Sequence, residues 1–398
     1  MKNALAVTLA GLLALALVAC SSGENAAPTT PSGDASASSG ATAESTPARP
    51  IDRGPYGGLV AGEAAPEFVG TQEWFNSEPL TLEGLIGAGQ VVLVDFWTYS
   101  CVNCQRTLPY VREWNAKYGD LGLTIVGVHT PEFRFEEDAG NVRNAILEAG
   151  IQYPVVQDND RKTWRAFDNR VWPAKYLIGA DGKVFYRHFG EGAYDETEEA
   201  IRAALEAAGR DVSDVKIGGL TEPALDGEMQ GMTRELYFGY ERNYSATGVY
   251  AAQDEYYGQP DTVIDFVDPG PPRKPNVWYA QGLWNNSDQA MVHLRDTDTY
   301  EDYVTFEFTA RAVNPVFSAP SAGATVVIEL DGAPLTAEQA GPDVDWDEMG
   351  RSIVRIDDPR MYRVVELPER DTRTLTIRSS ERGLSLYSVT FGSYVEGP

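Results

Sequence analysis

The stretch VDFWTYSCVNCQRTLPY, residues 94–110, decides how the rest of the chain is interpreted. It continues the apolar run QVVLVDFW, which is typical of a strand buried on both faces, and then takes the apolar spacing of a helix. At the junction stand Cys101 and Cys104, two of only three cysteines in 398 residues. A Cys-x-x-Cys pair beside alternating strands and helices predicts redox chemistry.

The third cysteine, Cys20, ends a segment of another kind. Residues 1–20, MKNALAVTLAGLLALALVAC, hold one early cation, an apolar run and a small-residue junction, which is the pattern of a secretory signal peptide. The ending LVAC resembles the lipobox of bacterial lipoproteins, which implies that Cys20 becomes the lipidated first residue. We therefore expect a protein of the bacterial cell envelope, extracytoplasmic and lipid-anchored to the membrane. The alternative is an ordinary cleaved signal with an incidental cysteine.

With Cys20 used as an anchor, Cys101 and Cys104 can pair only with each other. A bridge that closes so small a loop removes little chain entropy, so a purely stabilising disulfide is a poor explanation. Zinc needs four ligands, and the three histidines of the chain show no ligand spacing. We predict a redox-active disulfide between Cys101 and Cys104, with no metal and no other cofactor.

The chain divides into four parts by composition. After the signal, residues 21–50 are almost wholly Ala, Ser, Thr, Gly and Pro, a composition typical of a disordered linker. In residues 51–215 strand-like and helix-like segments alternate, which predicts an α/β sandwich. Residues 220–398 hold strands of period two and no long helix, which predicts an all-β sandwich of the jelly-roll kind. Its segments MYRVVELP and TLTIRSS are expected as separate strands.

The balance of charge narrows the range of partners. The chain carries a net charge of −27 at pH 7, which argues against nucleic acid and against charge-driven binding to anionic lipid. A hydrophobic content of 43% is ample for sizeable cores. We therefore expect large soluble domains whose membrane contact is the lipid anchor alone.

The two cysteines predict different roles. Cys101 stands where the strand passes into the helix, and unpaired N–H groups at a helix start favour a thiolate, which is the form that attacks a disulfide. Cys104, one turn later, resolves the mixed disulfide by attacking Cys101. Asp95 lies in the apolar strand just before, where burial raises its pKa, and is the candidate base for Cys104. The alternative for Asp95 is a partly exposed acid at a strand end.

The segment DFWTYSCVNC resembles the active site of thioredoxin-fold proteins. The resemblance implies that Asp95 is the buried acid of that family, Trp97 its active-site tryptophan and Pro109 the proline that kinks the active-site helix. VWPAKYLI resembles the loop whose cis-proline faces the cysteines, which implies that Pro173 is that residue, preceded by Trp172, and that it offers backbone to the substrate chain. The alternative is a trans proline that begins a strand.

A longer resemblance covers most of the mature chain. Together with an insertion typical of the TlpA and redoxin branch, FWTYSCVNCQR, GVHTPEF, WPAKYLI and FGEGAYDETE are similar to the soluble C-terminal part of DipZ-type thiol–disulfide proteins. LYFGYERN, RMYRVVELP and GLSLYSVTFG resemble the carbohydrate-binding-module-like β-sandwich attached to it. The fold implied is an α/β thioredoxin-like domain followed by an all-β jelly-roll-like sandwich. The CcdA-like membrane domain of that family is missing, so a separate CcdA-like partner is the expected electron donor.

The β domain leaves two interpretations open. Its aromatic residues form either the core of the sandwich or an exposed platform for a cell-envelope glycan. Because the domain holds no cysteine and no metal-ligand cluster, we expect it to orient the redox domain, so that a chain ending near Val215 keeps its reduction potential. The aromatic residues are Tyr250, Tyr256, Tyr257, Trp278, Tyr279 and Trp284.

These observations predict an extracytoplasmic thiol–disulfide oxidoreductase that acts on protein disulfides or thiols. One alternative is a redoxin-type thiol peroxidase, because Thr98 lies three residues before Cys101 as in that class, although Val94 stands where its motif has proline. The other is an envelope glycan-binding protein with a minor redox role. An intact set of Asp95, Cys-x-x-Cys and Pro173 argues against the second alternative.

Overall fold

The computed structural model describes residues 54, 56–220, 231–243, 249–258, 260–320 and 323–392. The predicted signal peptide, the predicted lipidation site Cys20 and the predicted linker of residues 21–50 lie outside the described residues. Within the described ranges, no helix combines the length and the apolar character needed to cross a bilayer.

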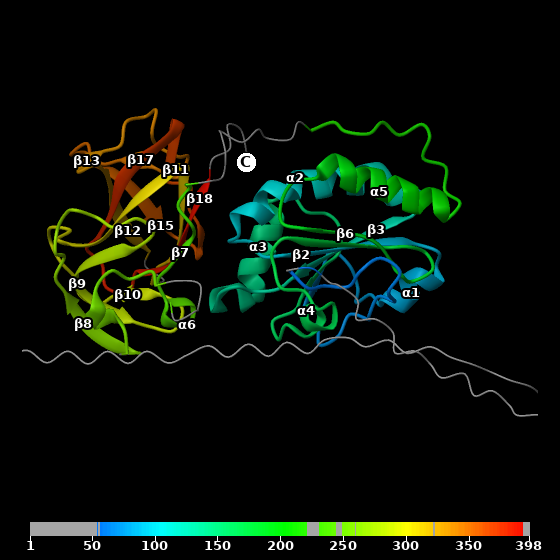
Figure 1. Cartoon of the computed structure of the whole chain (residues 1–398), viewed down its shortest axis with the longest axis horizontal. Helices are drawn as coiled ribbons and strands as arrows, with labels where there is room; N and C mark the ends of the chain where they lie inside the picture. The colour runs from blue at the N-terminus through cyan, green and yellow to red at the C-terminus, as the bar shows by residue number, and fades with distance from the viewer. Residues whose placement is uncertain are drawn as a thin grey trace, which may run out of the picture. The chain divides into compact units, whose positions relative to one another are not determined.

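The first region is an α/β sandwich built on a six-stranded sheet (Figure 1). The strand order is β1-β4-β3-β2-β5-β6, in which β2, β3 and β4 run parallel and the remaining pairs are antiparallel. Its strands are β1 Trp74–Phe75, β2 Val91–Trp97, β3 Leu123–His129, β4 Val155–Gln157, β5 Ala174–Ile178 and β6 Val184–Phe189. Its helices are α1 Leu82–Gly87, α2 Val102–Tyr118, α3 Ala139–Glu148, α4 Lys162–Ala166 and α5 Tyr194–Ala207, with short 3-10 turns η1 Gly119–Leu121 and η2 Arg134–Glu137.

Strand β2 lies inside the sheet and is buried along its whole length, as its apolar sequence predicts. Side chains alternate between the two faces of a strand, so Leu93 and Trp97 enter the core under α2, α3 and α5. Val94 and Phe96 enter the core on the opposite face, beside α4. Helices therefore cover both faces of the sheet, and this fixes the faces on which the functional side chains lie.

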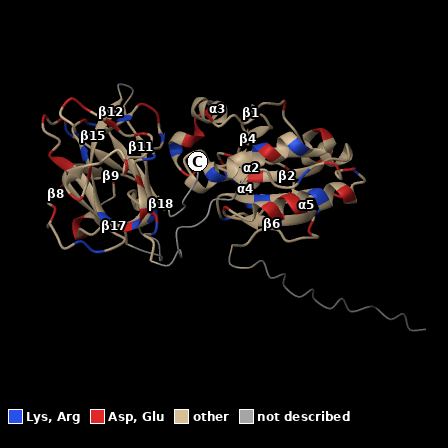
Figure 2. Cartoon of the chain, turned by 90° about the horizontal axis from the view of Figure 1, so that it is seen from above, with Lys and Arg blue, Asp and Glu red and all other residues tan. Residues whose placement is uncertain are grey.

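The active-site helix α2 begins and ends where the sequence predicts. Cys101 is its N-cap residue, Pro109 lies inside it, and Gly119 caps its C-terminus. Helix α5 carries Asp195 and Glu196 in its first turn, where acidic residues suit the helix dipole. Further along α5 the charged residues are Glu198, Glu199, Arg202 and Glu206, so acidic residues predominate on this helix (Figure 2).

Among its described residues, the second region is all-β apart from two short helical turns, as predicted. Its twelve strands form one sheet with the main order β14-β15-β12-β17-β11-β18-β10-β9-β8, and each pair in it is antiparallel. Strand β11 pairs with β17, β18 and β9, so the sheet folds around its own core. The strands are β7 Leu236–Tyr237, β8 Thr262–Phe266, β9 Trp278–Asn286, β10 Met291–His293, β11 Asp302–Ser318, β12 Ala324–Leu330, β13 Ala333–Pro334, β14 Asp345–Trp346, β15 Ser352–Ile356, β16 Arg360–Met361, β17 Val365–Ser379 and β18 Ser385–Gly392. The helical turns are α6 Tyr240–Asn243 and η3 Asp254–Tyr256.

One prediction about these strands is wrong. MYRVVELP and TLTIRSS were expected as separate strands, but the second half of MYRVVELP and most of TLTIRSS belong to the single strand β17. The polar residues between them, which suggest a turn, form an irregularity instead: Glu366 pairs with Ala312, whereas Asp371 pairs with Ala310. A β-bulge absorbs extra residues without ending the strand.

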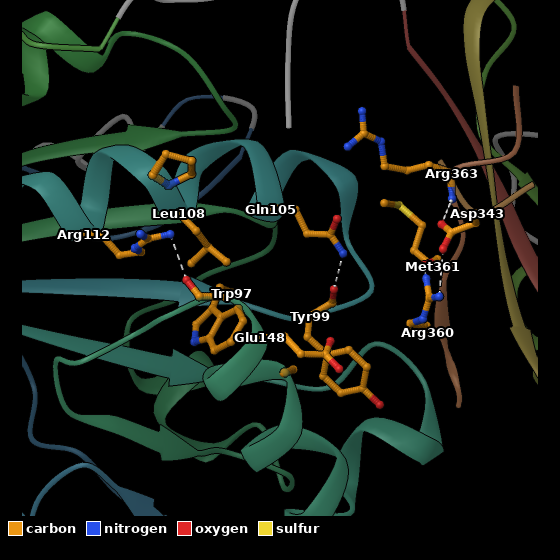
Figure 3. A pocket seen from close by; sticks show the side chains of 13 residues that line it. Trp97, Tyr99, Gln105, Leu108, Arg112, Glu148, Asp343, Arg360, Met361 and Arg363 are labelled. Carbon is orange, nitrogen blue, oxygen red and sulfur yellow. Dashed lines mark hydrogen bonds and ion pairs between the residues drawn. The ribbon is translucent and has the colours of Figure 1, made fainter. Parts of the chain in front are cut away.

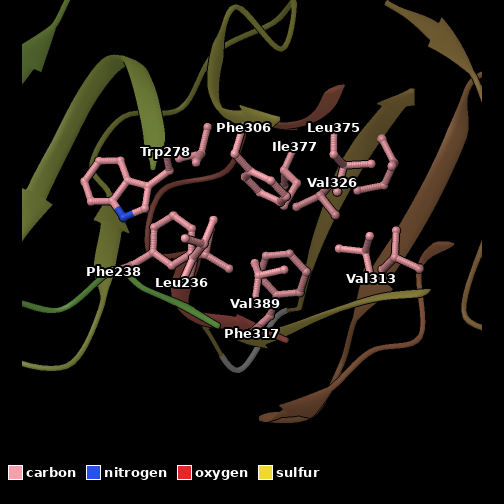
Figure 4. Close-up of a cluster of buried hydrophobic side chains, with 14 of the residues drawn as sticks. Leu236, Phe238, Trp278, Phe306, Val313, Phe317, Val326, Leu375, Ile377 and Val389 are labelled. Atoms are coloured by element: carbon pink, nitrogen blue, oxygen red, sulfur yellow. The ribbon is translucent and has the colours of Figure 1, made fainter. Parts of the chain in front are cut away.

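The aromatic residues of this region belong to its core. Trp278, Trp284 and Tyr256 are almost completely buried, Tyr250 and Tyr279 are buried as well, and Tyr257 is half-buried against the same cluster. Figure 4 shows Trp278 and Phe238 among the aliphatic side chains of this core, and their rings stack with centroids 5.1 Å apart. The interpretation of these residues as an exposed platform for sugar is therefore wrong, because their ring faces are not available to a ligand.

Candidate active site

The two predicted redox cysteines are both free thiols at the start of α2. Cys101 is half-buried and, as the N-cap, has its Sγ within reach of the Cys104 backbone N–H, which donates to it over 3.4 Å. Cys104 lies one turn later and is only 1% exposed. A reagent or a substrate can therefore reach Cys101 much more easily than Cys104.

Burial also controls the protonation of Cys104. Removal from water raises the pKa of its thiol well above the ordinary value, and a hydrogen bond to Cys101 acts in the same direction. A weaker opposing effect comes from the backbone at Thr98. Because only a thiolate attacks a disulfide, Cys104 needs a nearby group to accept its proton.

Asp95 lies where such a group is needed. It follows Leu93 on the same face of β2, which is the face that packs against α2 and Cys104. Its carboxyl is buried, and burial raises its pKa to about 6, against an opposing effect of Lys175. The prediction that Asp95 is a buried acid is confirmed. Its role as the acceptor of the Cys104 proton stays a prediction.

Lys175 is a member of this site that the sequence predictions missed. It is the register partner of Asp95 across β2 and β5, and it is completely buried. Burial lowers its pKa, whereas Asp95, Cys104 and Glu191 act in the opposite direction. A lysine is rarely buried without a partner of opposite charge, so Asp95 and Lys175 form a buried acid–base pair beneath the cysteines.

Several buried polar atoms around this pair have no hydrogen-bond partner among the described residues. Such atoms are rare in folded proteins, and a group of them marks either strain or chemistry. Two of them belong to the Asp95–Lys175 pair and a third is the indole N–H of Trp97. The atoms are Asp95 Oδ1, Lys175 Nζ, Trp97 Nε1, His129 Nδ1 and Tyr153 OH.

The proline loop has the predicted geometry. The Trp172–Pro173 bond is cis, so the alternative of a trans proline is wrong. The indole of Trp172 donates to the carbonyl of Thr130 over 3.0 Å, and the carbonyl of Pro173 accepts from the N–H of Gly190 over 2.8 Å. Pro173 has no N–H and its carbonyl already has a partner, so its contact with a substrate chain remains a prediction.

The residue just before the attacking cysteine is held by a second missed residue, Glu136. Its Oε1 accepts from the hydroxyl of Ser100 over 2.6 Å and from the N–H of Ser100 over 3.2 Å. Its Oε2 accepts from the N–H groups of Glu132 and Phe133 over 2.6 and 2.9 Å. Glu136 is completely buried, and these four bonds fix the loop that leads into α2.

A pocket of about 550 Å³ lies beside α2 (Figure 3). Leu108 and Gln105 of α2 line it together with Trp97, Glu148 of α3 and Met361 of β16. The Gln105 side chain donates to the carbonyl of Tyr99 over 2.8 Å, and both residues line the pocket. Neither cysteine lines it, so it is separate from the site of thiol attack.

No group of three or more His, Cys, Asp and Glu side chains in the described part of the chain is arranged to hold a metal ion. His129 is completely buried, which lowers its pKa to about 3, and its Nε2 lies 3.4 Å from the hydroxyl of Thr98, so its ring is a neutral member of the core.

Two family matches cover most of the described chain. Residues 61–187 match the AhpC/TSA family, and residues 233–392 match the family described as thioredoxin like C-terminal domain. The chain is 34% identical over 333 residues to Protein DipZ of Mycobacterium tuberculosis, which is 82% of this chain and 43% of DipZ. It therefore spans less than half the length of that relative.

Two shorter relatives match the first region. The chain is 36% identical over 127 residues to thiol-disulfide oxidoreductase YkuV of Bacillus subtilis, covering 32% of this chain and 82% of YkuV. It is 29% identical over 144 residues to thiol-disulfide oxidoreductase ResA of Bacillus thuringiensis, covering 36% of this chain and 78% of ResA. With a thioredoxin-like sheet, two cysteines at the start of α2 and these relatives, the chain belongs to the family of thioredoxin-like thiol–disulfide oxidoreductases.

Proposed function

We propose that this protein exchanges thiols and disulfides with protein substrates through Cys101 and Cys104. The observation that carries the proposal is the difference between two sulfurs one helical turn apart. Cys101 is half-buried at a helix N-terminus, whereas Cys104 is 1% exposed above a buried Asp95–Lys175 pair. This arrangement separates a sulfur that meets the substrate from one that acts only inside the protein.

In the first step, the Cys101 thiolate attacks one sulfur of a substrate disulfide. A bond forms between Cys101 and that sulfur, the substrate S–S bond breaks, and the other substrate sulfur leaves as a thiolate that takes up a proton. The backbone N–H of Cys104, in the first turn of α2, donates to the Sγ of Cys101 over 3.4 Å, so a donor already points at the attacking sulfur. The half-buried position of Cys101 lets the substrate sulfur approach.

In the second step, Cys104 attacks the sulfur of Cys101 and releases the substrate as a thiol. The Cys101–Cys104 disulfide forms, and two electrons have passed from the dithiol to the substrate. Asp95 accepts the proton that Cys104 loses, since its pKa of about 6 leaves it ionised at neutral pH. The positive charge of Lys175 favours both the ionised carboxylate and the Cys104 thiolate.

The trapping experiment tests this division of roles. Cys104→Ser should accumulate a mixed disulfide between Cys101 and the substrate, because the second step is lost. Cys101→Ser should neither exchange nor trap. The rate at which insulin disulfides are reduced measures turnover. Mass spectrometry identifies the cysteine that carries the trapped substrate. Trapping on Cys104 in the Cys101→Ser variant, with none on Cys101 in the Cys104→Ser variant, would reverse the assignment.

The thiol peroxidase remains the competing candidate, since the AhpC/TSA match covers residues 61–187. Two observations favour disulfide exchange. A second thiol, Cys104, stands one turn from Cys101. The hydroxyl of Thr98, the residue that suggested a peroxidase, lies 3.4 Å from the Nε2 of His129. Turnover of hydrogen peroxide and of a mixed disulfide by the same preparation separates the two. Peroxide turnover that is faster by an order of magnitude or more would favour the peroxidase.

We also propose an extracytoplasmic position, with Cys20 as the lipidated residue and a CcdA-like membrane protein as the source of electrons. The lipobox-like LVAC and the resemblance to DipZ-type proteins support this. Cys20→Ala should release the protein from the membrane fraction and abolish labelling by a radioactive fatty acid. Retention of both would exclude the anchor. Glycan binding loses its main support, because the aromatic residues proposed for it are core residues.

A further inference from the structure

The β region holds the turn that carries Cys101. One contact involves Val102, which lies between the two cysteines in sequence. Its side chain is buried in a small cluster with Phe133 of the α/β region and with Val316 and Met361 of the β region. Val102 is only 7% exposed, so the β region covers one side of the Cys-x-x-Cys turn.

A second contact involves Tyr99, which precedes Cys101 in sequence. The hydroxyl of Tyr99 donates to the carbonyl of Pro359 over 3.2 Å, and the Tyr99 ring is buried. The side chain of Gln105 in turn donates to the carbonyl of Tyr99. Pro359 therefore binds Tyr99, and Met361, two residues later, lies in one buried cluster with Val102.

The third contact reaches Ser100 through residues 132–136. Glu136 binds Ser100, and its other oxygen binds the N–H groups of Glu132 and Phe133. The β region holds the same segment, because Tyr237 donates to Glu132 over 3.0 Å and Arg242 pairs with Glu132 at 3.0 Å.

Three residues close to Cys101 in sequence are thus held by the β region. Tyr99 is held by its hydrogen bond to Pro359, Val102 by a shared buried cluster, and Ser100 through one short segment. Formation of a disulfide must bring the two sulfurs to about 2.05 Å, which requires the first turn of α2 to adjust. Contacts that fit one redox state better than the other change the equilibrium between them, because the coupling is reciprocal.

We propose that the β region is a positioning element for Cys101, and that its contacts with Tyr99, Ser100 and Val102 set the equilibrium between the dithiol and the disulfide. This inference rests on the proposed function. It replaces the expectation that a chain ending near Val215 keeps its reduction potential, because removal of the β region would expose Val102, Phe133 and Tyr99.

Two methionine substitutions in the β region provide a matched test. Met361→Ala removes the side chain that packs on Val102, whereas Met291→Ala removes an equally buried methionine from the core of the same region. Each full-length variant is equilibrated with mixtures of reduced and oxidised glutathione, and the fraction of disulfide is measured. Unfolding by urea reports the general loss of stability in both.

We expect Met361→Ala to change the equilibrium constant with glutathione at least threefold, which is about 14 mV at 29.6 mV per tenfold change. Met291→Ala should leave it within twofold. Alkylation of Cys101 by iodoacetamide should be at least threefold faster in Met361→Ala than in Met291→Ala. An unchanged equilibrium and an unchanged alkylation rate in Met361→Ala would overturn the inference.

Val102→Ala makes the test independent of folding defects in the β region. If the contact carries the effect, the double variant Val102→Ala, Met361→Ala should shift the equilibrium no further than either single variant. Fully additive shifts would contradict the proposed contact. A wild-type protein that does not equilibrate with glutathione through Cys101 and Cys104 would defeat the proposed function itself, whereas a normal wild type with unmoved variants would defeat only this inference.

Discussion

Asp95 and Lys175 face each other as register partners across β2 and β5, and both side chains are buried on the side of the sheet that carries Cys104. Opposite charges on neighbouring strands favour the ionised form of each group, whereas burial opposes ionisation. For Asp95 the balance leaves the pKa raised to about 6, and for Lys175 it leaves the pKa lowered. Asp95 can therefore take up or release a proton close to neutral pH, where the proposed reaction occurs.

The first prediction concerns release of the substrate. Asp95→Asn should slow the attack of Cys104 on a preformed mixed disulfide by roughly 100-fold, which is typical of the loss of a general base. The attack of Cys101 on a substrate should change far less, because that step does not use the proton of Cys104. Stopped-flow kinetics of the two steps measures this. Equal slowing of both steps would argue for a general distortion of the site.

The second prediction is a pH profile. In the wild type, the rate of the second step should rise as the pH passes about 6, where Asp95 loses its proton and can accept that of Cys104. Lys175→Met removes a charge that lowers the Asp95 pKa, so the inflection should move to higher pH. Lys183→Met, an exposed lysine near β6, is the control and should leave the profile in place. Profiles that coincide in all three proteins would contradict the pairing.

The third prediction concerns stability. The folded pKa of Asp95 is about 6 against an ordinary 3.8, so between about pH 4 and 6 the native state keeps a proton that the unfolded chain has lost. Ionisation of Asp95 therefore destabilises the fold as the pH rises through this window. Asp95→Asn should raise the free energy of unfolding by about 1–3 kcal/mol at pH 7.5, and the gain should vanish below about pH 4. Urea unfolding at both pH values checks this; a gain that persists at low pH would contradict it.

The fourth prediction concerns Glu136. Glu136→Gln replaces a carboxylate that accepts four hydrogen bonds, two of them from Ser100. A loss of about 1–3 kcal/mol in the free energy of unfolding is expected, because buried donors lose a charged acceptor. Glu137→Gln, its exposed neighbour, should change stability by less than about 0.5 kcal/mol. Equal effects of the two substitutions would show that Glu136 does not hold the turn.

Most of the α/β region could be predicted from its sequence, because its signals are local. The unbroken apolar run of β2 indicates a strand buried on both faces, and Gly119 marks the end of α2. The short elements β1 and α1 carry too few residues for a periodic pattern. In the β region, the polar residues inside β17 suggested a turn where the strand only changes register.

The parts of the site that were missed depend on contacts between distant segments. In the sequence, Lys175 looks like an ordinary polar residue of a strand. The apolar residues on both sides of it in WPAKYLI indicate that both faces of that strand are buried. Glu136 and Met361 carry no such hint, because their partners Ser100 and Val102 lie far away in sequence. Which residues of the β region cover the Cys-x-x-Cys turn follows only from packing in three dimensions.

In the proposed cycle, Cys101 attacks the substrate disulfide and Cys104 resolves the mixed disulfide. The most direct test is alkylation of the fully reduced protein with less than one equivalent of iodoacetamide, followed by digestion and mass spectrometry of the peptide that carries both cysteines. The label should lie on Cys101, since Cys104 is 1% exposed and burial raises the pKa of its thiol. A label found mainly on Cys104 would show that the two cysteines have the opposite roles.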